Sequence, residues 1–441
     1  MELRVPSDVS ALIERLRGEG HEAFVVGGCV RDALRGTEPG DWDLATGARP
    51  EEIQRIFPRS VYANRFGTVV VRTRERDVEV TTYRIEADYA DHRRPDHVRF
   101  TDSLRADLSR RDFTINAMAW RPPGELVDPF GGAADLERRI VRAVGDPEER
   151  VREDALRMLR AVRFATTLGM AIEPGTANAI ERCAHLAVEL SGERIGAEMT
   201  KIVLSERPSV GLRLLADLGL LAVLAPELEE CRTVPQEKAY AQDVFEHSLL
   251  TVDAVAEPDL VLRLAALLHD VGKPRTFGDG HFHQHEFVGE HLARTILRRW
   301  KYPKETITAV AHLVRNHMFW YQQEWTPAAV RRFIRKVGLD EIPRLFELRR
   351  ADNVGSGARA PRMYALDELW RRVQEEIAGA NAFSPRDLEV DGNDVMAALG
   401  IPSGPEVGRI IRELFERVLD DPSLNEREAL LRLAREIHRP G

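Results

Sequence analysis

FVVGGCVRDALRGTEPGDWD, residues 24–43, is the stretch of this 441-residue sequence that decides the fold of its first part. An apolar run ends at Gly27 and Gly28, and a helix is expected to follow. Glycines at such a turn let backbone N–H groups approach phosphate oxygens, and the start of a helix favours negative charge. Asp41 and Asp43 follow as D-x-D. Two carboxylates two positions apart on a strand share one face, so they can hold a divalent metal ion together.

Each half of this stretch also has an ordinary interpretation. The glycines can form a simple turn, and the aspartates can belong to a solvated acidic loop. A phosphate cradle followed by a metal pair, in this order, is the equipment of nucleotidyl transfer. The combination therefore favours a nucleotidyltransferase.

The composition excludes several classes of protein. Hydrophobic residues make up 43% of the chain and charged residues 31%, which is typical of globular proteins. The length predicts about three domains. We find no run of 18 apolar residues, so no membrane span is expected, and the first 20 residues favour an amphipathic helix over a signal peptide. Three widely spaced cysteines predict no disulfide framework and favour a reducing cytoplasm.

The formal net charge of −9 argues against a general nucleic-acid coat but allows local basic surfaces. Basic residues gather at 138–163 and 294–304, and again at 331–336. Each patch can be an RNA contact or only a solvated helix face.

The pattern along the chain changes near residue 130. Before it, short β-rich runs predict strands at 23–27, 41–45, 67–73 and 77–84, and polar residues at 85–101 predict a loop. From about residue 135, Leu-, Ala- and Arg-rich segments predict helices. The fold class is therefore α+β, with a sheet-containing head followed by a long helical body.

Further side chains complete the expected transferase site. Arg31 follows the glycines, and its planar guanidinium can bind phosphate oxygens in pairs. The predicted strand at 77–84 offers Glu79 as a third carboxylate, with Asp77 as the same-face alternative.

Acidic and basic side chains fall at helical spacing in the first part of the body. They are Asp154, Arg157, Arg160 and Arg163. Such residues commonly form solvated ion pairs. Several arginines on one face beside a phosphate site favour contacts with a base edge and with phosphates.

The successive motifs resemble those of the class II tRNA nucleotidyltransferase/poly(A) polymerase family, which belongs to the polymerase-β-like nucleotidyltransferases. They cover residues 22–205 and read GGCVRD…DWDLAT, RRDFTINAMAW, DPFGG…DL, VGDPEERVREDALRMLRAVRF and SGERIGAEMTKI. The resemblance implies that Asp41 and Asp43 bind catalytic Mg²⁺. It also implies that Gly28, Arg31 and Arg111 contact the incoming nucleotide, with Gly27 in the same turn.

The resemblance further implies how the base is chosen. Asp154 and Arg157 would pair with the base edge of CTP or ATP, assisted by Arg160 and Arg163. An acceptor and a donor fork on one helix can mimic a complementary base, so the protein would be its own template. The motif at Arg194 is expected to brace a helix.

The implied reaction is attack of a tRNA 3′-hydroxyl on the α-phosphorus of CTP or ATP, which builds the CCA end. The alternatives are an enzyme that adds only A or only CC, then a poly(A) polymerase, then a phosphohydrolase with a nucleotide-binding head. Residues 85–101 resemble a flexible loop that A-adding relatives keep, which favours full CCA or A addition.

A second set of motifs lies at 245–352, in FEHSLLTVD, LAALLHDVGKPRTF, FHQHEFVG, VRNHMFW and LRRADN. Their order resembles the HD metal-dependent phosphohydrolase superfamily. Imidazoles and carboxylates in this order predict a site for a divalent transition metal such as Mn²⁺ or Ni²⁺, with Lys273 near phosphate. The first metal would take His247, His269, Asp270 and Asp352, and a second metal or a phosphate would meet His285 and His317.

These observations predict four parts. They are a nucleotidyltransferase head at 1–150, a nucleotide-selecting and RNA-binding neck at 151–235, an HD-like domain at 236–357 and a helical tRNA-binding tail at 358–441. An HD-like fold that binds tRNA without turnover remains an alternative for the third part.

Overall fold

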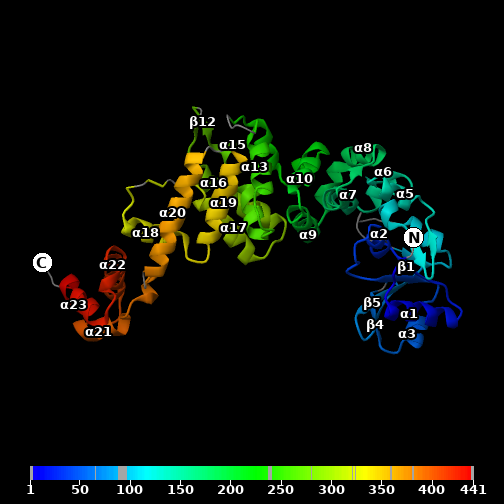
Figure 1. Cartoon of the computed structure of the whole chain (residues 1–441), viewed down its shortest axis with the longest axis horizontal. Helices are drawn as coiled ribbons and strands as arrows, with labels where there is room; N and C mark the ends of the chain where they lie inside the picture. Colours follow the sequence, from blue (N-terminus) through cyan, green and yellow to red (C-terminus); the bar gives the residue numbers. More distant parts are fainter. Residues whose placement is uncertain are drawn as a thin grey trace. The chain divides into compact units, whose positions relative to one another are not determined.

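The computed structural model describes residues 3–64, 66–87, 97–236, 241–279, 281–319, 321–322, 324–357, 360–379 and 382–438 (Figure 1). The chain forms two compact units. One holds residues 1–229 with 299–301, and the other holds 230–298 with 302–441. The finer division into four parts stays a prediction. Within the described ranges, no helix combines the length and the apolar character that crossing a membrane requires.

The first unit is built on a seven-stranded sheet with the order β3-β4-β5-β2-β1-β8-β9. β2 and β5 pair in parallel, and the other neighbours are antiparallel. The strands are β1 (Ala23–Val26), β2 (Asp43–Thr46), β3 (Ser60–Asn64), β4 (Thr68–Arg72), β5 (Asp77–Thr82), β8 (Ala119–Arg121) and β9 (Glu125–Val127). The strands expected at 23–27, 67–73 and 77–84 are confirmed. β3, β8 and β9 were not expected, because short strands are defined by their pairing partners more than by their own pattern.

Helices α1 (Ser7–Gly18), α2 (Gly28–Leu34) and α3 (Pro50–Ile56) pack on this sheet. α1 is the amphipathic helix that the sequence predicts, and its apolar side chains Val9, Ile13 and Leu16 are buried with Leu44 of β2. The apolar faces of α1 and α3 thus close one core, which holds β1 and β2 rigidly.

The prediction of a loop over residues 85–101 is wrong at the two ends of this segment. β6 (Arg84–Ala87) and β7 (His97–Phe100) pair as an antiparallel ribbon. Cross-strand hydrogen bonds can order polar sequence that has no clear alternation. Residues 88–96 lie outside the described residues.

The rest of the first unit is helical from residue 132, apart from the short parallel pair β10 (Ile140–Val141) and β11 (Ala171–Ile172). α4 (Leu104–Ser109) and the 3₁₀ turn η1 (Thr114–Asn116) precede it. The later helices are α5 (Gly132–Glu137), α6 (Pro147–Glu153), α7 (Leu156–Leu168), α8 (Pro174–Cys183), α9 (Gly192–Val203), α10 (Pro208–Asp217), α11 (Leu220–Leu224) and α12 (Pro226–Glu229), with the 3₁₀ turn η2 (Ala184–Glu189).

The second unit is helical except for the hairpin β12 (Phe277–Gly278) and β13 (His281–Phe282). Its α-helices are α13 (Val244–Asp253), α14 (Leu260–Leu268), α15 (Lys273–Thr276), α16 (His285–Arg299), α17 (Lys304–Asn316), α18 (Pro327–Val337), α19 (Ile342–Gly355), α20 (Ala360–Gly379), α21 (Gly392–Leu399), α22 (Pro405–Asp420) and α23 (Arg427–His438). The 3₁₀ turns are η3 (Glu230–Thr233), η4 (Pro385–Asp387) and η5 (Pro422–Leu424).

The basic patch at 331–336 holds helices together. Arg331 is 6% exposed and donates to the carbonyl oxygens of Leu419 (2.7 Å) and Asp420 (2.9 Å). These two residues form the C-terminal end of α22. Its guanidinium also pairs with Glu376 of α20. Arg332 and Arg335 pair with Glu416 of α22. These guanidiniums therefore tie α18 to α20 and α22, and this patch is largely used within the chain.

Candidate functional site

A cleft of about 460 Å³ lies in the first unit, and we call it the head cleft. Most of the residues that the sequence assigns to nucleotide binding line it together. They are Gly27, Gly28, Arg31, Asp43, Arg111, Asp154, Arg157 and Arg160. Asp41, Glu79 and Arg163 are not among its lining residues.

Gly27 allows the glycine turn and Arg111 to meet. Its φ of +79° is a conformation that side chains disfavour, and α2 begins at the next residue. A Cβ atom at Gly27 would lie 2.7 Å from the guanidinium of Arg111. A glycine therefore suits the turn, and any side chain at this position would shift the guanidinium of Arg111 from the start of α2.

The predicted carboxylates lie at the edge of this cleft. Asp43 opens β2 and is the register partner of Glu79 on β5, so the two side chains lie side by side on parallel strands. Burial and the neighbouring Glu79 raise the pKa of Asp43 to about 6. A buried carboxylate whose pKa is raised beside a second carboxylate is suited to a cation, and oxygen ligands suit Mg²⁺.

The sequence suggested that both aspartates of the D-x-D motif lie on one strand. The structure corrects this expectation. β2 begins only at Asp43, and Asp41 is an exposed residue in the bend before it. Trp42 between them is 4% exposed and anchors the bend in the core. The aspartates are therefore close in sequence but differ in backbone setting.

A chain of polar contacts crosses the head cleft. Arg31 donates from Nη1 to Asn116 Oδ1 (2.7 Å), and Asn116 donates from Nδ2 to Asp112 Oδ1 (3.0 Å). The other oxygen of Asp112 lies 2.6 Å from Arg160 Nη2. Burial acts to raise the pKa of Asp112, but Arg160 and the bond from Asn116 lower it to about 2. Asp112 thus stays ionised and joins arginines of α2 and α7.

Asp154 and Arg157 do not share one helix, which corrects the expectation. α6 ends at Glu153, Asp154 has an extended backbone (φ −145°, ψ 102°), and α7 begins at Leu156. Asp154 is the C-cap residue of α6, and its Oδ1 accepts from the N–H of Leu156, two residues further on (3.1 Å). The acceptor and the donor therefore lie on either side of a break between two helices.

Each member of this pair is held by other residues. Arg194 of α9 donates from Nη2 to both oxygens of Asp154, at 2.9 and 2.8 Å. Arg157 donates to the main-chain oxygens of Arg150 and Arg110, each at 3.0 Å, and to Glu153 Oε2 at 2.6 Å. Arg194 is thus a brace, in agreement with the sequence, but it braces Asp154 itself.

Phe164 is a residue of the head cleft that the sequence did not single out. The guanidiniums of Arg31, Arg160 and Arg163 lie 5.0, 5.4 and 3.7 Å from the centre of its ring. Arg163 also pairs with Glu198 of α9 at 2.5 Å, which turns it away from the cleft. An aromatic residue directly after two arginines at helical spacing was the available signal.

A second candidate site lies in the second unit, where two groups of three side chains have ligand atoms within 4.8 Å of one another. These six residues form what we call the helical cluster: His247, His269 and Asp352 in one group, and Asp270, His285 and His317 in the other. Among the described residues these are the groups that meet this distance, and Asp41, Asp43 and Glu79 do not form a third. The six residues that the sequence proposed for this site are brought together, but Asp270, expected with the first metal, groups with His285 and His317.

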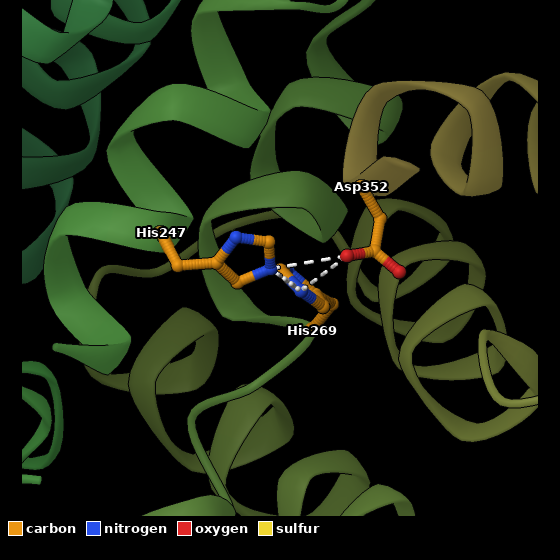
Figure 2. Close-up of side chains that lie close together, drawn as sticks. All are labelled: His247, His269 and Asp352. Carbon is orange, nitrogen blue, oxygen red and sulfur yellow. Dashed lines mark hydrogen bonds and ion pairs between the residues drawn. The ribbon is translucent and has the colours of Figure 1, made fainter. Parts of the chain in front are cut away.

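The first group converges from three helices. Figure 2 shows the side chains of His247 (α13), His269 (after α14) and Asp352 (α19) pointing toward one another. His247 Nε2 lies 3.1 Å from His269 Nε2 and 3.1 Å from Asp352 Oδ1. Ligand atoms on adjacent vertices of an octahedral transition metal are separated by about 3 Å, given bonds of about 2.1 Å. The spacing therefore fits a metal ion.

Asp270 connects the two groups through its two oxygens. Oδ2 lies 3.2 Å from His269 Nε2 and 3.5 Å from His247 Nε2. Oδ1 lies 3.3 Å from His285 Nε2 and 3.6 Å from His317 Nε2. Burial acts to raise the pKa of Asp270, but His269 and Lys273 hold it well below its usual value. One ionised carboxylate therefore faces both groups.

Main-chain oxygens orient three of the imidazoles. Nδ1 of His269 lies 2.8 Å from Ala266 O, Nδ1 of His285 lies 3.1 Å from Phe282 O, and Nδ1 of His317 lies 2.7 Å from Val314 O. A carbonyl oxygen only accepts, so each Nδ1 carries a proton, and in the neutral imidazole Nε2 keeps its lone pair for a metal ion. This is the arrangement found around metal-binding histidines.

A glycine lets the helices of the cluster approach. A Cβ atom at Gly272, in the HDVGK motif, would lie 2.2 Å from His285 O and 2.6 Å from Gly289 N. Any side chain there would push α16 and His285 away from Asp270. His281 and His283, by contrast, are exposed and take no part in the two groups.

Three family models match the chain. The poly A polymerase head domain matches residues 23–142, and a model for an RNA- and SrmB-binding site of polymerase A matches 169–232. A tRNA nucleotidyltransferase domain 2 model matches 286–434. The first two matches lie in the first unit, except for residues 230–232, and the third lies in the second unit, except for residues 299–301.

Whole-length relatives agree. A CCA-adding enzyme of Geobacillus kaustophilus is 37% identical over 95% of this chain and 94% of its own length, and one of Enterococcus faecalis is 33% identical over 98% and 97%. The crystal structure of the Bacillus stearothermophilus CCA-adding enzyme with CTP has a TM-score of 0.75 and 32% identity, covering 98% of this chain and 97% of that one. The chain therefore belongs to the CCA-adding enzyme family of nucleotidyltransferases.

Proposed function

We propose that this chain adds CCA to the 3′ end of tRNA from CTP and ATP, without a nucleic-acid template, in the cytoplasm. The observation that carries the proposal is the head cleft, where Asp43 and Arg111 lie with Asp154 and Arg157. Relatives that align over nearly the whole chain are CCA-adding enzymes, and one of them is solved with CTP.

The residues of the cleft divide the work. Arg31 and Arg111 hold the triphosphate beside the turn at Gly27, because guanidiniums bind phosphate oxygens in pairs. Asp41 and Asp43 hold Mg²⁺, with Glu79 as the third carboxylate. When bound, the ion lowers the pKa of the attacking hydroxyl and offsets the charge of the leaving pyrophosphate. Asp154 accepts from the base edge and Arg157 donates to it, so C and A are matched by the protein. No covalent intermediate with the protein is required.

The test uses three tRNA acceptors that end before CCA, after C and after CC, each with CTP or ATP alone. Full CCA addition requires incorporation of C on the first two and of A on the third. Incorporation only on the third identifies an A-adding enzyme, failure only on the third a CC-adding enzyme, and untemplated A runs a poly(A) polymerase. The segment 85–101, which favours full CCA or A addition, lies partly outside the described residues.

Asp43→Asn provides the control for metal-dependent chemistry. We expect it to lower kcat on all three acceptors by at least about a thousandfold, because it removes a charge that holds Mg²⁺ while keeping the shape of the side chain. Circular dichroism should show an unchanged fold. Near-normal turnover would exclude the head cleft as the active site.

We infer a second activity, hydrolysis of phosphate esters at the helical cluster with Mn²⁺, Ni²⁺ or a similar ion. The supporting observation is the cluster of four buried imidazoles and two carboxylates with Nε2 atoms turned inward. Imidazole ligands suit transition metals, and a bound metal ion activates water for attack on phosphorus. Release of product from 2′,3′-cyclic nucleotides with Mn²⁺ or Ni²⁺, and its loss with a chelator, tests the activity. A cluster that only binds metal as a scaffold for tRNA would give no product.

A further inference from the structure

Two buried polar side chains lie beside the helical cluster, and the ion pair with Asp270 explains only one of them, Lys273. Lys273 is 7% exposed and Gln236 is 9% exposed. Lys273 Nζ lies 2.5 Å from Asp270 Oδ2 and 3.4 Å from Gln236 Oε1. Gln236 therefore reaches the cluster through the lysine.

The chemistry of Lys273 decides how Gln236 is turned. An ammonium group only donates hydrogen bonds, so the amide oxygen of Gln236 must face it and the amide nitrogen must face away. That nitrogen, Nε2, is buried and has no hydrogen-bond partner among the described residues. A buried donor without a partner is unfavourable and needs an explanation.

The position of Gln236 is fixed by its own backbone. Its N–H donates to Gln242 O at 3.2 Å, and Val244 N–H donates to Val234 O at 3.1 Å, around the bridge between Pro235 and Asp243. The orphan amide is therefore held in place beside Lys273.

The charge of the cluster changes when metal ions bind. Without them, Lys273 compensates the buried carboxylate of Asp270. Asp270 and Asp352 cannot neutralise two divalent cations and a lysine together. The loaded cluster keeps a net positive charge, and Asp270 no longer needs the lysine. An ammonium and an amide N–H side by side then require an anion.

We propose that Gln236 joins Lys273, which the sequence already placed near phosphate, to form the phosphate-binding subsite of the helical cluster. Lys273 Nζ and Gln236 Nε2 donate to non-bridging oxygens of a phosphate group, and Lys273 leaves Asp270 for the phosphate once metal ions are bound. This proposal rests on the phosphohydrolase function, for which it names the phosphate-holding residues. Both side chains would contact the phosphate directly, and among the described residues the amide nitrogen of Gln236 has no other hydrogen-bond partner.

The test measures binding of inorganic phosphate to the full-length, Mn²⁺-loaded protein by isothermal titration calorimetry. The protein variants are Gln236→Leu, Gln236→Glu and Lys273→Met, with the exposed Gln374→Leu of α20 as the matched control. We expect phosphate to bind only the loaded protein. We expect affinity to fall roughly ten- to a hundredfold in each of the three variants and to stay unchanged in the control. Bound Mn²⁺, measured by elemental analysis, should stay at the wild-type level in Gln236→Leu and Gln236→Glu, which a general loss of structure would not allow.

Equal phosphate affinity in wild type, Gln236→Leu and Gln236→Glu would overturn the subsite, as would absence of phosphate binding to the loaded wild type. Phosphate binding that depends on Gln236 in a protein that hydrolyses no ester would support the subsite and remove the phosphohydrolase activity. Hydrolysis with unchanged KM and kcat in both Gln236 variants would keep the activity and reject the subsite.

Discussion

At the scale of single residues, the head cleft depends on what is missing at Gly27. The absent side chain leaves room for the guanidinium of Arg111, and the positive φ allows the turn before α2. Both effects bring a cation to the start of α2, where a triphosphate would lie.

Gly27→Ala should lower kcat/KM for CTP and ATP by roughly ten- to a hundredfold, because the new Cβ displaces a hydrogen-bonding guanidinium. Gly36→Ala is the matched control. Gly36 has a similar φ of +75°, but nothing lies within 4 Å of its Cβ position. It should lose about 1 kcal/mol of stability from backbone strain and keep its kinetics. Equal kinetic losses in the two variants would show that strain, not displacement of Arg111, is responsible.

At the scale of elements, the break between α6 and α7 sets the geometry of base selection. Asp154 leaves the helical path and is held by Arg194, while Arg157 is held from the other side by main-chain oxygens. The two groups are fixed separately, so each can be changed without moving the other.

Asp154→Ala and Arg157→Ala should lower the rate of CTP and ATP addition and allow addition of UTP or GTP. The loss of about 1–3 kcal/mol of hydrogen bonding should reduce the discrimination between correct and incorrect nucleotides roughly ten- to a hundredfold. Arg194→Met should act in the same direction as Asp154→Ala but more weakly, since it frees Asp154 without removing it. Kinetics with all four nucleotides on one acceptor measure this. Unchanged selectivity in all three variants would place base selection elsewhere.

The tie from α18 to α22 is a second feature at this scale. Arg331→Leu should lower the stability of the second unit by roughly 3–5 kcal/mol, because it leaves Glu376 partly buried without its cation and two helix-end carbonyls without a donor. Arg332→Ala, whose ion pairs are about half exposed, should cost less than about 1 kcal/mol. Thermal unfolding compares the two, and similar losses would contradict the tie.

At the scale of the whole molecule, the chain carries two chemically different candidate sites, one in each compact unit. The head cleft offers oxygen ligands and guanidiniums, whereas the helical cluster offers imidazoles. His269→Ala with Asp270→Ala should therefore abolish hydrolysis of phosphate esters and bound transition metal while CTP and ATP addition continues. Assays of both activities on one preparation measure this, and joint loss in a folded protein would show that the sites are coupled.

The sequence predicted the residues of the helical cluster better than those of the head cleft, which Asp41, Glu79 and Arg163 do not line. The order of its residues along the sequence was enough to predict the helical cluster: His247, His269, Asp270, His285, His317 and Asp352. Each of them lies in a short motif that can be identified without the residues between the motifs. The helix break at Asp154 was missed because Arg194, which holds the Asp154 side chain, lies 40 residues away. The sequence could not decide whether Arg331 contacts RNA or lies on a solvated helix face, because its partners lie on α20 and α22. Local pattern identifies reactive groups, but the partners that hold them come from tertiary packing.

The polar chain from Arg31 through Asn116 and Asp112 to Arg160 has a consequence for the entropy of nucleotide binding. An arginine side chain loses up to about 2 kcal/mol of rotamer freedom when it is immobilised. Here the loss occurs on folding, because protein partners already fix both ends of the chain. A nucleotide entering the head cleft meets guanidiniums that are ordered before it arrives. More of its contact energy therefore remains as affinity.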